Sequence, residues 1–352
     1  MKLGKLRAQF GEEEIDGFLI ASYENRYYMS GFSGTAGTLI ISADDAALVT
    51  DFRYVEQAKV QAPEFRVIMH KGPMVDTVKE VAAGMGLKRV GFESERMTFS
   101  NYDLINQALD GVEMVPLKGL VESLRMIKSD EEVDLIAEAC RITDAAFDHI
   151  LGYIKPGVTE SEIANELVSF MVKRDARPSF DFIVASGERS ALPHGVASSK
   201  AIEAGDFVTL DFGGFYKRYT SDMTRTVVVG KLTEEQKAIY DLVLRAQLAS
   251  IDAARAGRTG KEVDGVARGI IEEAGHSEHF GHGLGHSVGL EIHENPRFSP
   301  ADSSLIEPQM VLSVEPGVYV PGWGGVRIED LVVITNGEAR VLSHSPKDLI
   351  QL

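Results

Sequence analysis

The sequence has few cysteines and an excess of acidic over basic residues. Its 352 residues include one cysteine, Cys140, so the chain cannot form an internal disulfide, and we expect a reducing compartment. Lysine and arginine number 36 against 53 aspartates and glutamates, which gives a net charge of −17. Nucleic-acid binding requires a basic surface, so this composition argues against DNA or RNA as a partner.

Long apolar runs are also missing. The basic N-terminus is followed only by the short run 15–22, whose approach is interrupted by acidic residues. This run is too short for a signal peptide or a membrane span. With 44% hydrophobic and 25% charged residues, the composition is that of an ordinary globular protein. We therefore expect a cytoplasmic protein, not bound to a membrane, that is long enough for two domains.

The first 122 residues alternate between strand and helix patterns. Strands are predicted at 17–21, 37–42, 46–50, 65–69, 89–92 and 113–116, and helices at 53–61, 74–85 and 101–109. The glycine-rich segment 31–37 lacks the Lys-Ser/Thr of a phosphate loop, so a turn is predicted there. The alternation predicts an α/β domain over residues 1–122 and a second domain over 123–352.

The second domain contains an internal repeat. Capping boxes predict helices that start after Ser129, Thr159, Thr233 and Thr259, and Cys140 falls on the apolar stripe of the first. The segments 157–163 and 257–263 match at an offset of 100 residues. The segments 202–213 and 306–317 match at an offset of 104 residues. The repeat predicts a duplicated α+β unit with approximate two-fold symmetry and a site where the halves meet.

Both copies of the repeat end a strand in a carboxylate. Asp211 and Glu315 occupy equivalent positions, and a second acid follows each of them, Asp222 and Glu329. A single acid of this kind is usually a solvated charge at a strand edge, but apolar strand residues flank all four. Four acids in one cleft would repel one another unless cations separated them. Oxygen-rich clusters bind hard or borderline divalent metals, so the pattern predicts a two-metal hydrolase.

Histidines concentrate in one glycine-rich stretch. His282, His286 and His293 lie within twelve residues, among glycines that argue against a helix and suit close approach to a ligand. Three histidines in one glycine-rich stretch, in a chain that also carries the four acids, favour a functional role. For His194, a core position and a site position are about equally expected from the sequence.

These motifs resemble the pita-bread metallopeptidases, which include proline dipeptidase (prolidase), aminopeptidase P and methionine aminopeptidase. The resemblance implies a creatinase-like α/β domain over 1–122 and a pita-bread α+β catalytic domain with an internal pseudo-two-fold repeat over 123–352. The motifs at 25–34 and 50–54 resemble the extra domain of the prolidase and aminopeptidase P branch, which methionine aminopeptidases of this fold lack.

The resemblance also implies roles for individual residues. Two divalent metal ions are expected, manganese first, with cobalt and zinc as alternatives. The implied ligands are Asp211, Asp222, His286, Glu315 and Glu329, with Asp222 and Glu329 bridging the two ions. The implied catalytic residues are His194, His293 and Glu315. The implied substrate-binding residues are His282, Arg327 and Tyr319. For Arg327, three roles stay open: ordering Asp211 or Asp222, holding a substrate carboxylate, or forming a structural ion pair.

The expected activity is hydrolysis of the Xaa-Pro bond by a hydroxide that bridges the two metals. The expected substrates are proline-containing dipeptides or peptides, and the family suggests a homodimer. The sequence does not choose between a dipeptidase and an aminopeptidase. The alternatives are an exopeptidase like methionine aminopeptidase, a non-catalytic pita-bread module that binds proteins, and a metal-free creatine amidinohydrolase. The complete set of acids argues against the last two.

Overall fold

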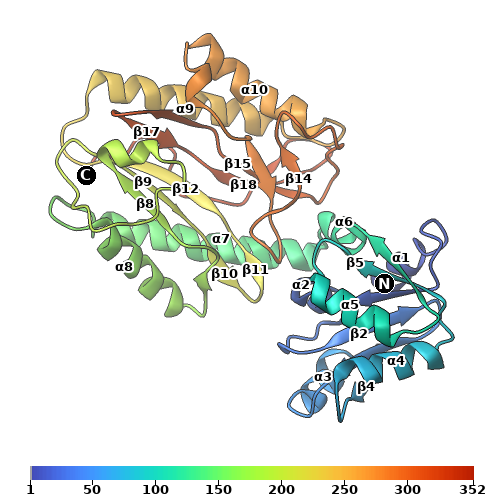
Figure 1. Ribbon diagram of the computed structural model, residues 1–352. Coiled ribbons are helices and arrows are strands. Elements are labelled where there is room, and N and C mark those ends of the chain that lie inside the picture. The colour runs from blue at the N-terminus through green and yellow to red at the C-terminus, as the bar shows by residue number, and fades with distance from the viewer. Residues whose placement is uncertain (1) are drawn as a thin grey trace. The chain divides into compact units, whose positions relative to one another are not determined.

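The structure is a computed structural model that describes residues 2–352 (Figure 1). The chain divides between Arg125 and Met126 into two compact units. This division lies three residues beyond the boundary that the sequence suggests, after residue 122. Within residues 2–352, no helix combines the length and apolarity that crossing a membrane requires.

The N-terminal unit is built on one mixed sheet of six strands. The strands are β1 (Gly17–Ile20), β2 (Thr38–Ser42), β3 (Ala46–Thr50), β4 (Arg66–Met69), β5 (Arg89–Glu93) and β6 (Glu113–Leu117). Their order is β4-β3-β2-β1-β5-β6, with β1 antiparallel to β2 and parallel to β5. The α/β fold predicted for this part of the chain is confirmed.

The helices of this unit are α1 (Lys2–Arg7), α2 (Tyr23–Ser30), α3 (Val55–Gln61), α4 (Met74–Gly84), α5 (Phe99–Ala108) and α6 (Leu120–Met126). The sequence pattern predicts α3, α4 and α5 but misses the other three. These three are short, and the N-cap of α2, Ser22, makes no side-chain capping bond. Local signals are therefore weak there. The glycine-rich segment 31–37 forms a loop, as predicted, beginning at Gly31 in the left-handed region with φ of 75°.

The C-terminal unit repeats one arrangement of helices. The helices are α7 (Asp130–Leu151) and α8 (Glu160–Val172) in the first half and α9 (Glu234–Ala253) and α10 (Gly260–Glu273) in the second. Figure 1 shows strands between the α7–α8 pair and the α9–α10 pair. All four predicted capping boxes form with both reciprocal hydrogen bonds. Short 3₁₀ turns, η1 (Gly187–Ala191) and η2 (Ser277–His279), complete the helical elements of the described chain.

The strands of this unit repeat as well. The first half contains β7 (Arg177–Pro178), β8 (Ile183–Ser186), β9 (Phe207–Phe212), β10 (Gly214–Tyr216), β11 (Tyr219–Thr220) and β12 (Met223–Val228). The second half contains β13 (Gly285–Ser287), β14 (Glu294–Phe298), β15 (Val311–Val314), β16 (Gly317–Val320), β17 (Gly324–Arg327), β18 (Asp330–Val333) and β19 (Arg340–Val341).

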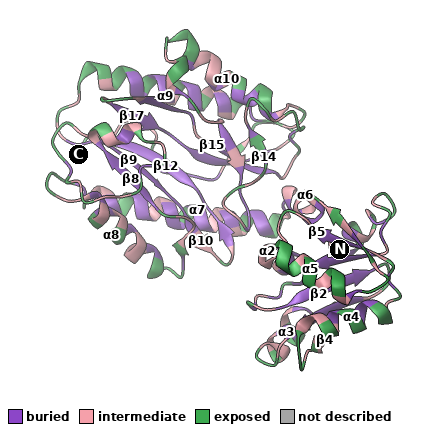
Figure 2. Cartoon of the chain, viewed as in Figure 1, coloured by how far each residue is buried: buried purple, intermediate pink, exposed green. Residues whose placement is uncertain are grey.

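Each half returns its acid-bearing strand through a small two-stranded ribbon. In the first half β9 pairs antiparallel with β12, and β10 with β11 lies between them in sequence. In the second half β15 pairs antiparallel with β18, and β16 with β17 takes the same place. The predicted duplicated α+β unit is therefore confirmed. Its strands and the inward helix faces are buried (Figure 2), and Cys140 is buried on α7.

Candidate metal centre

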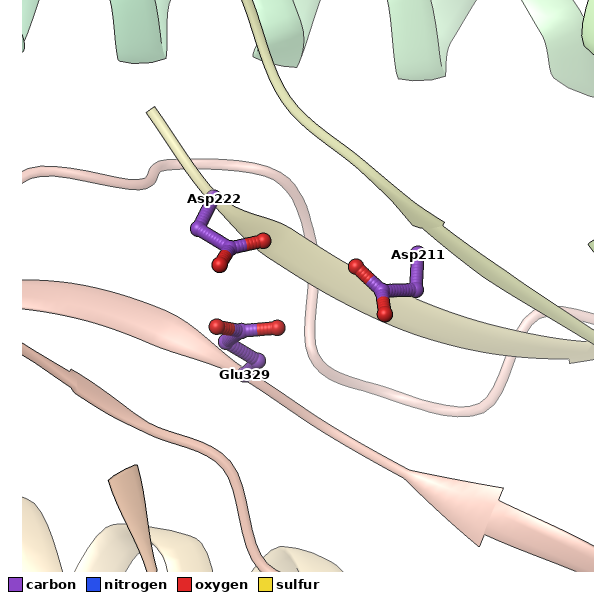
Figure 3. Close-up of side chains that lie close together, drawn as sticks. All are labelled: Asp211, Asp222 and Glu329. Atoms are coloured by element: carbon purple, nitrogen blue, oxygen red, sulfur yellow. The ribbon is translucent and has the colours of Figure 1, made fainter. Parts of the chain in front are cut away.

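Three carboxylates converge where the two halves of the C-terminal unit meet. Asp211 lies on β9, Asp222 directly precedes β12 and Glu329 directly precedes β18. Each offers an oxygen, and these oxygens all lie within 4.8 Å of one another. Figure 3 shows the three side chains pointing toward a common point. The repeated strand–ribbon–strand arrangement places Asp222 and Glu329 at equivalent positions of the two copies, so the duplication itself builds the cluster.

Each of these three buried carboxylates has one oxygen without a hydrogen-bond partner within residues 2–352. Asp211, Asp222 and Glu329 are 8%, 5% and 1% exposed. Among the described residues, no partner contacts Asp211 Oδ1, Asp222 Oδ1 or Glu329 Oε1. An unpaired buried carboxylate oxygen is strongly unfavourable, and a bound cation would satisfy it. Burial, followed by the neighbouring acids, raises the pKa of Asp222 and of Glu329 well above the ordinary carboxyl value.

Glu315 and His286 extend the cluster on one side. His286, on β13, places Nε2 3.3 Å from Glu315 Oε1 and 3.6 Å from Asp222 Oδ2. Its Nδ1 lies 3.2 Å from the carbonyl oxygen of Ser287, which can only accept, so Nδ1 carries the proton. Burial lowers the pKa of His286 to about 4, so the ring is neutral. The bare Nε2 then faces carboxylate oxygens, an arrangement that a cation between them would stabilise.

The donor set fits divalent metal ions. It combines four carboxylates, Asp211, Asp222, Glu315 and Glu329, with the imidazole nitrogen of His286. Oxygen donors with one imidazole suit manganese, cobalt and zinc. The unpaired oxygens and the bare Nε2 are the features of this structure that support the fit.

Arg327 is held by groups of the protein itself. Its Nη2 donates to Asp211 Oδ2 at 2.5 Å, and its Nε donates to Thr224 Oγ1 at 3.0 Å. Its Nη1 donates to the Tyr319 hydroxyl at 2.8 Å and to the Pro193 carbonyl at 3.1 Å. Of the three roles left open by the sequence, these contacts favour the ordering of Asp211.

Tyr319 links Arg327 to His282. The His282 Nδ1 lies 2.7 Å from the carbonyl oxygen of Gly283, so Nδ1 donates and Nε2 accepts from the Tyr319 hydroxyl at 3.0 Å. Burial raises the pKa of Tyr319 to about 12. Burial also lowers the pKa of His282, which keeps its ring neutral near pH 7.

A cavity of about 450 Å³ opens over the cluster. All of the site residues predicted from the sequence line it except Tyr319, which sits behind His282 and Arg327. His194 and His293 are exposed at its wall. The rings of His286 and His293 lie 4.4 Å apart between centroids, and partial burial of the ring, together with the neighbouring His286, lowers the pKa of His293 to about 4.

Sequence reasoning missed several residues of the cavity wall. Arg297 lines the cavity because it pairs across the β13–β14 ladder with His286. Phe180, Ile183 and Ile292 supply apolar wall. The cross-strand pairing places Arg297 beside His286, and this neighbour cannot be read from the sequence. Also missed was Thr224, whose Oγ1 donates to Glu329 Oε2 at 2.6 Å.

Comparison with known proteins identifies the family. Residues 134–336 match metallopeptidase family M24, and residues 2–127 match the creatinase/prolidase N-terminal domain. The chain belongs to metallopeptidase family M24. It is therefore a metal-dependent peptidase of the pita-bread fold, which confirms the family resemblance and the fold predicted from the sequence.

Individual relatives match over the whole chain. The Xaa-Pro dipeptidase of Pyrococcus furiosus is 40% identical over 99% of this chain and 99% of its own. A solved Xaa-Pro dipeptidase from Bacillus anthracis is 50% identical, covers 100% of this chain and 99% of its own, and has a TM-score of 0.99. The X-Pro aminopeptidase from Thermotoga maritima is 38% identical over 96% and 98% of the two chains, with a TM-score of 0.92.

Proposed function

We propose that this chain hydrolyses Xaa-Pro peptide bonds with two divalent metal ions. The observation that carries the proposal is the convergence of three buried carboxylates, each with one unpaired oxygen. The names of the relatives, Xaa-Pro dipeptidase and X-Pro aminopeptidase, support the substrate class. The complete donor set argues against a non-catalytic binding module.

Five residues would hold the ions: Asp211, Asp222, His286, Glu315 and Glu329. Family resemblance implies that Asp222 and Glu329 are shared by the two ions, with Asp211 serving one and His286 with Glu315 the other. When bound, the ions supply an acidified water and polarise the scissile carbonyl. Manganese is the metal we propose on family resemblance, with cobalt and zinc as alternatives, and the predominance of oxygen donors suits it.

Neighbouring side chains orient these carboxylates. Arg327 donates to Asp211, Thr224 donates to Glu329, and Ser313 Oγ donates to Glu315 Oε1 at 2.9 Å. Such contacts fix the direction of the remaining lone pairs. Glu315 lies at the edge of the cluster, where its carboxylate can carry a proton to the leaving nitrogen.

The histidines of the cavity wall suit a substrate whose scissile amide has no N–H. The nitrogen of the Xaa-Pro bond belongs to the proline ring and is tertiary, so the enzyme must recognise the carbonyl oxygen instead. His194 and His293 offer imidazole donors from the exposed wall, and they would stabilise the oxyanion of the transition state. His282, held by Tyr319, would contact the substrate.

Arg297 favours a dipeptidase over an aminopeptidase. It brings a positive charge to the cavity wall beside His286, its partner on the neighbouring strand. In an Xaa-Pro dipeptide the carboxylate belongs to the proline itself, next to the scissile bond, where a guanidinium could hold it. In a longer substrate that position is an uncharged peptide group. Replacing Arg297 by methionine should therefore weaken dipeptide binding more than tripeptide binding.

The setting of the enzyme is also part of this proposal. The single buried cysteine suits a reducing, cytoplasmic compartment. A homodimer is proposed on family resemblance alone. Sedimentation of the purified chain measures the oligomeric state directly, and a monomer would contradict that part.

One experiment tests the activity. The purified chain, stripped of metal and reloaded with Mn²⁺, is given an Xaa-Pro dipeptide, an Xaa-Pro-Yaa tripeptide and Met-Ala-Ser. We expect turnover of the dipeptide that disappears on chelation and returns with Mn²⁺. Preference for the tripeptide would identify an aminopeptidase. Cleavage of Met-Ala-Ser alone would support the rival methionine aminopeptidase-like activity and contradict the proposal.

A further inference from the structure

Each histidine-bearing segment of the cavity wall is tied to a buried carboxylate that does not itself line the cavity. The segments are 186–198 with His194, 280–284 with His282, and the β13–β14 hairpin with His286 and His293. All four histidines line the cavity, whereas the three carboxylates, Glu160, Asp264 and Glu294, are not part of its described wall. The contacts of these acids therefore concern the segments and not the substrate.

Glu160 forms hydrogen bonds with both ends of the segment that carries His194. It is the first residue of α8 and is fully buried. Its carboxylate accepts hydrogen bonds from the backbone nitrogen and the hydroxyl of Ser186 at 2.8 and 2.9 Å. It also accepts from the backbone nitrogen and the hydroxyl of Ser198 at 3.1 and 2.6 Å. The two ends of the His194 segment thus converge on one side chain.

The guanidinium group of Arg189 adds a further link between Glu160 and this segment. Arg189, inside the segment, donates Nε to Glu160 Oε2 at 3.0 Å. Its Nη2 donates to the carbonyl oxygen of Val196 at 2.8 Å. Val196 lies two residues after His194 and lines the cavity. The ion pair therefore links the buried acid to the backbone beside the histidine.

The second half of the unit holds His282 in a comparable way. Asp264, buried on α10, pairs with Arg268 at 2.8 and 2.9 Å and accepts from the backbone nitrogen of Leu284 at 3.0 Å. Arg268 donates to the carbonyl oxygens of Phe280 at 3.0 Å and His282 at 2.9 Å. One acid and one arginine thus bind the backbone before, at and after His282.

The hairpin with His286 and His293 is held by Lys128. Its ammonium group is buried and lies 3.2 Å from Glu294 Oε2 and 3.1 Å from Ser287 Oγ. Glu294 directly follows His293, and Ser287 directly follows His286. One lysine therefore bridges the two strands at the point where the loop with His293 leaves and rejoins them.

Stability alone is a weak reason for such pairs. Removing charges from water offsets most of the attraction between them, so a buried ion pair adds little net stability. What a buried, directional pair does provide is a single backbone geometry. Catalytic groups lose about a hundredfold in rate when they are misplaced by about 1 Å.

We propose that Glu160, Asp264 and Lys128 are positioning residues, each of which sets the histidine or histidines of its own segment. The roles of those histidines rest on the proposed function above. The alternative is that the three residues only stabilise the fold. In that case their replacement would lower stability without acting on one particular histidine.

Metal binding separates Lys128 from Glu160 without any measurement of activity. Mn²⁺ binding to the purified chain is measured by calorimetry for Lys128→Met and Glu160→Gln. The hairpin fixed by Lys128 carries His286, a proposed ligand, so Lys128→Met should weaken Mn²⁺ binding about 10- to 100-fold. The segment fixed by Glu160 carries no proposed ligand, so Glu160→Gln should leave binding unchanged. Equal effects of the two variants would overturn the proposal.

The environment of each histidine ring gives a second readout. In metal-free protein, ¹⁵N–¹H correlation of the histidine side chains is compared for Glu160→Gln, Asp264→Asn and Lys128→Met. The largest shift changes should fall on His194, on His282, and on His286 with His293, respectively. A uniform change over all rings would contradict the proposal. Because no catalysis is needed, this result stays decisive if the wild-type chain hydrolyses no Xaa-Pro peptide, which would refute the proposed function instead.

Coupling in the active enzyme provides the third readout. Each positioning variant should lower kcat/KM about 10- to 100-fold. Glu160→Gln combined with His194→Ala should cost less than the product of the single losses, while Glu160→Gln combined with His293→Ala should equal the product. The reverse pattern would refute the assignment.

Two further variants guard against a trivial loss of folding. Lys128→Arg keeps the ion pair and should keep Mn²⁺ binding within about threefold of wild type, whereas Lys128→Met/Glu294→Gln removes both charges and leaves no unpaired ion. If the double variant folds, binds Mn²⁺ as tightly as wild type and gives the wild-type ¹⁵N–¹H shifts for its histidine rings, Lys128 has no positioning role. Glu93→Gln is the matched control, because it makes the same change in a buried acid of the other unit.

Discussion

Buried acids occur in both units of this protein, but they differ in the hydrogen-bond donors that surround them. Glu93, at the end of β5 in the N-terminal unit, is 5% exposed. It accepts hydrogen bonds from the backbone nitrogens of Ala21 and Ser22 and from the side chains of Ser22 and Asn25. Asp222 is equally buried, yet its Oδ1 has no partner among the described residues.

The difference between these two acids lies in the donors around them. A buried carboxylate with several donors is a structural element, because its charge is already compensated by the protein. A buried carboxylate that keeps an unpaired oxygen beside other acids is costly unless a ligand compensates it. Burial alone therefore does not identify a functional acid, whereas a buried carboxylate oxygen without a donor, beside other acids, points to one.

The strongest test of this comparison is to remove each acid in turn and measure hydrolysis. Asp222→Asn should lower kcat/KM for an Xaa-Pro dipeptide about a thousandfold or more, because the metal ions contribute several kcal/mol to the transition state. Glu93→Gln is the control and should stay within about twofold of wild type, since it lies in the other unit. Normal activity of Asp222→Asn after exhaustive chelation and reloading would remove the basis of the proposed site.

Metal addition should stabilise the protein, and more so at high pH. An ion at about one hundred times its Kd adds about 2.7 kcal/mol to the free energy of unfolding. The pKa values of Asp222 and Glu329 are raised in the metal-free fold, so the folded chain keeps protons that the unfolded chain releases. The contribution of these two carboxyl groups to the stability of the metal-free protein therefore falls as the pH rises above about 4.

At pH 8, bound metal ions compensate the carboxylates and so restore the stability that the metal-free protein loses there. At pH 5 the loss of stability is smaller, because protons neutralise the carboxylates, and the protons also compete with the metal ions. Thermal unfolding with and without Mn²⁺ at the two pH values measures the difference. An increase in Tm that is the same at both pH values would contradict the idea that uncompensated carboxylates form the site.

Glu93 should matter for stability in the way that Asp222 does not. Glu93→Gln loses the charge that its donors surround, and its amide group cannot accept at both ends. The free energy of unfolding should fall by about 1–3 kcal/mol. Urea unfolding of the metal-free protein gives this number. If the variant is as stable as wild type, Glu93 is not the structural acid that its contacts indicate.

The smallest expected effect has the opposite sign. In metal-free protein at pH 8, Asp222→Asn should raise the free energy of unfolding by about 1 kcal/mol, because folding with Asp222 requires either a buried charge or the uptake of a proton, and asparagine requires neither. The same urea titration as for Glu93→Gln compares the two variants directly. Destabilisation by both changes would mean that the two acids do not differ in kind.

Much of the fold was predictable because its signals are local. The capping boxes at Ser129, Thr159, Thr233 and Thr259 depend on residues three apart, and all four helices begin where predicted. The strands of the N-terminal unit follow continuous apolar runs. The helices α1, α2 and α6 were missed because their local signals are weak, and such short helices depend on tertiary contacts, for example that of Asn25 on α2 with Glu93.

The candidate site was predicted in part. The repeat indicated that Asp211 and Glu315 end equivalent strands, and the structure brings Asp211 together with Asp222 and Glu329. The partners that orient these acids were not predictable. Thr224 reaches Glu329 across 105 residues of sequence, and Arg297 reaches the cavity through its pairing with His286.

By itself, the sequence determined the chemistry of this protein, because the duplicated strands carry their acids at fixed positions and the glycine-rich stretch carries its histidines. Only the tertiary structure decided which of those oxygens lack donors and which ion pairs hold the histidine segments. The physical reason is distance along the chain: whether a buried charge is compensated depends on groups one hundred or more residues away, and no local pattern encodes their approach.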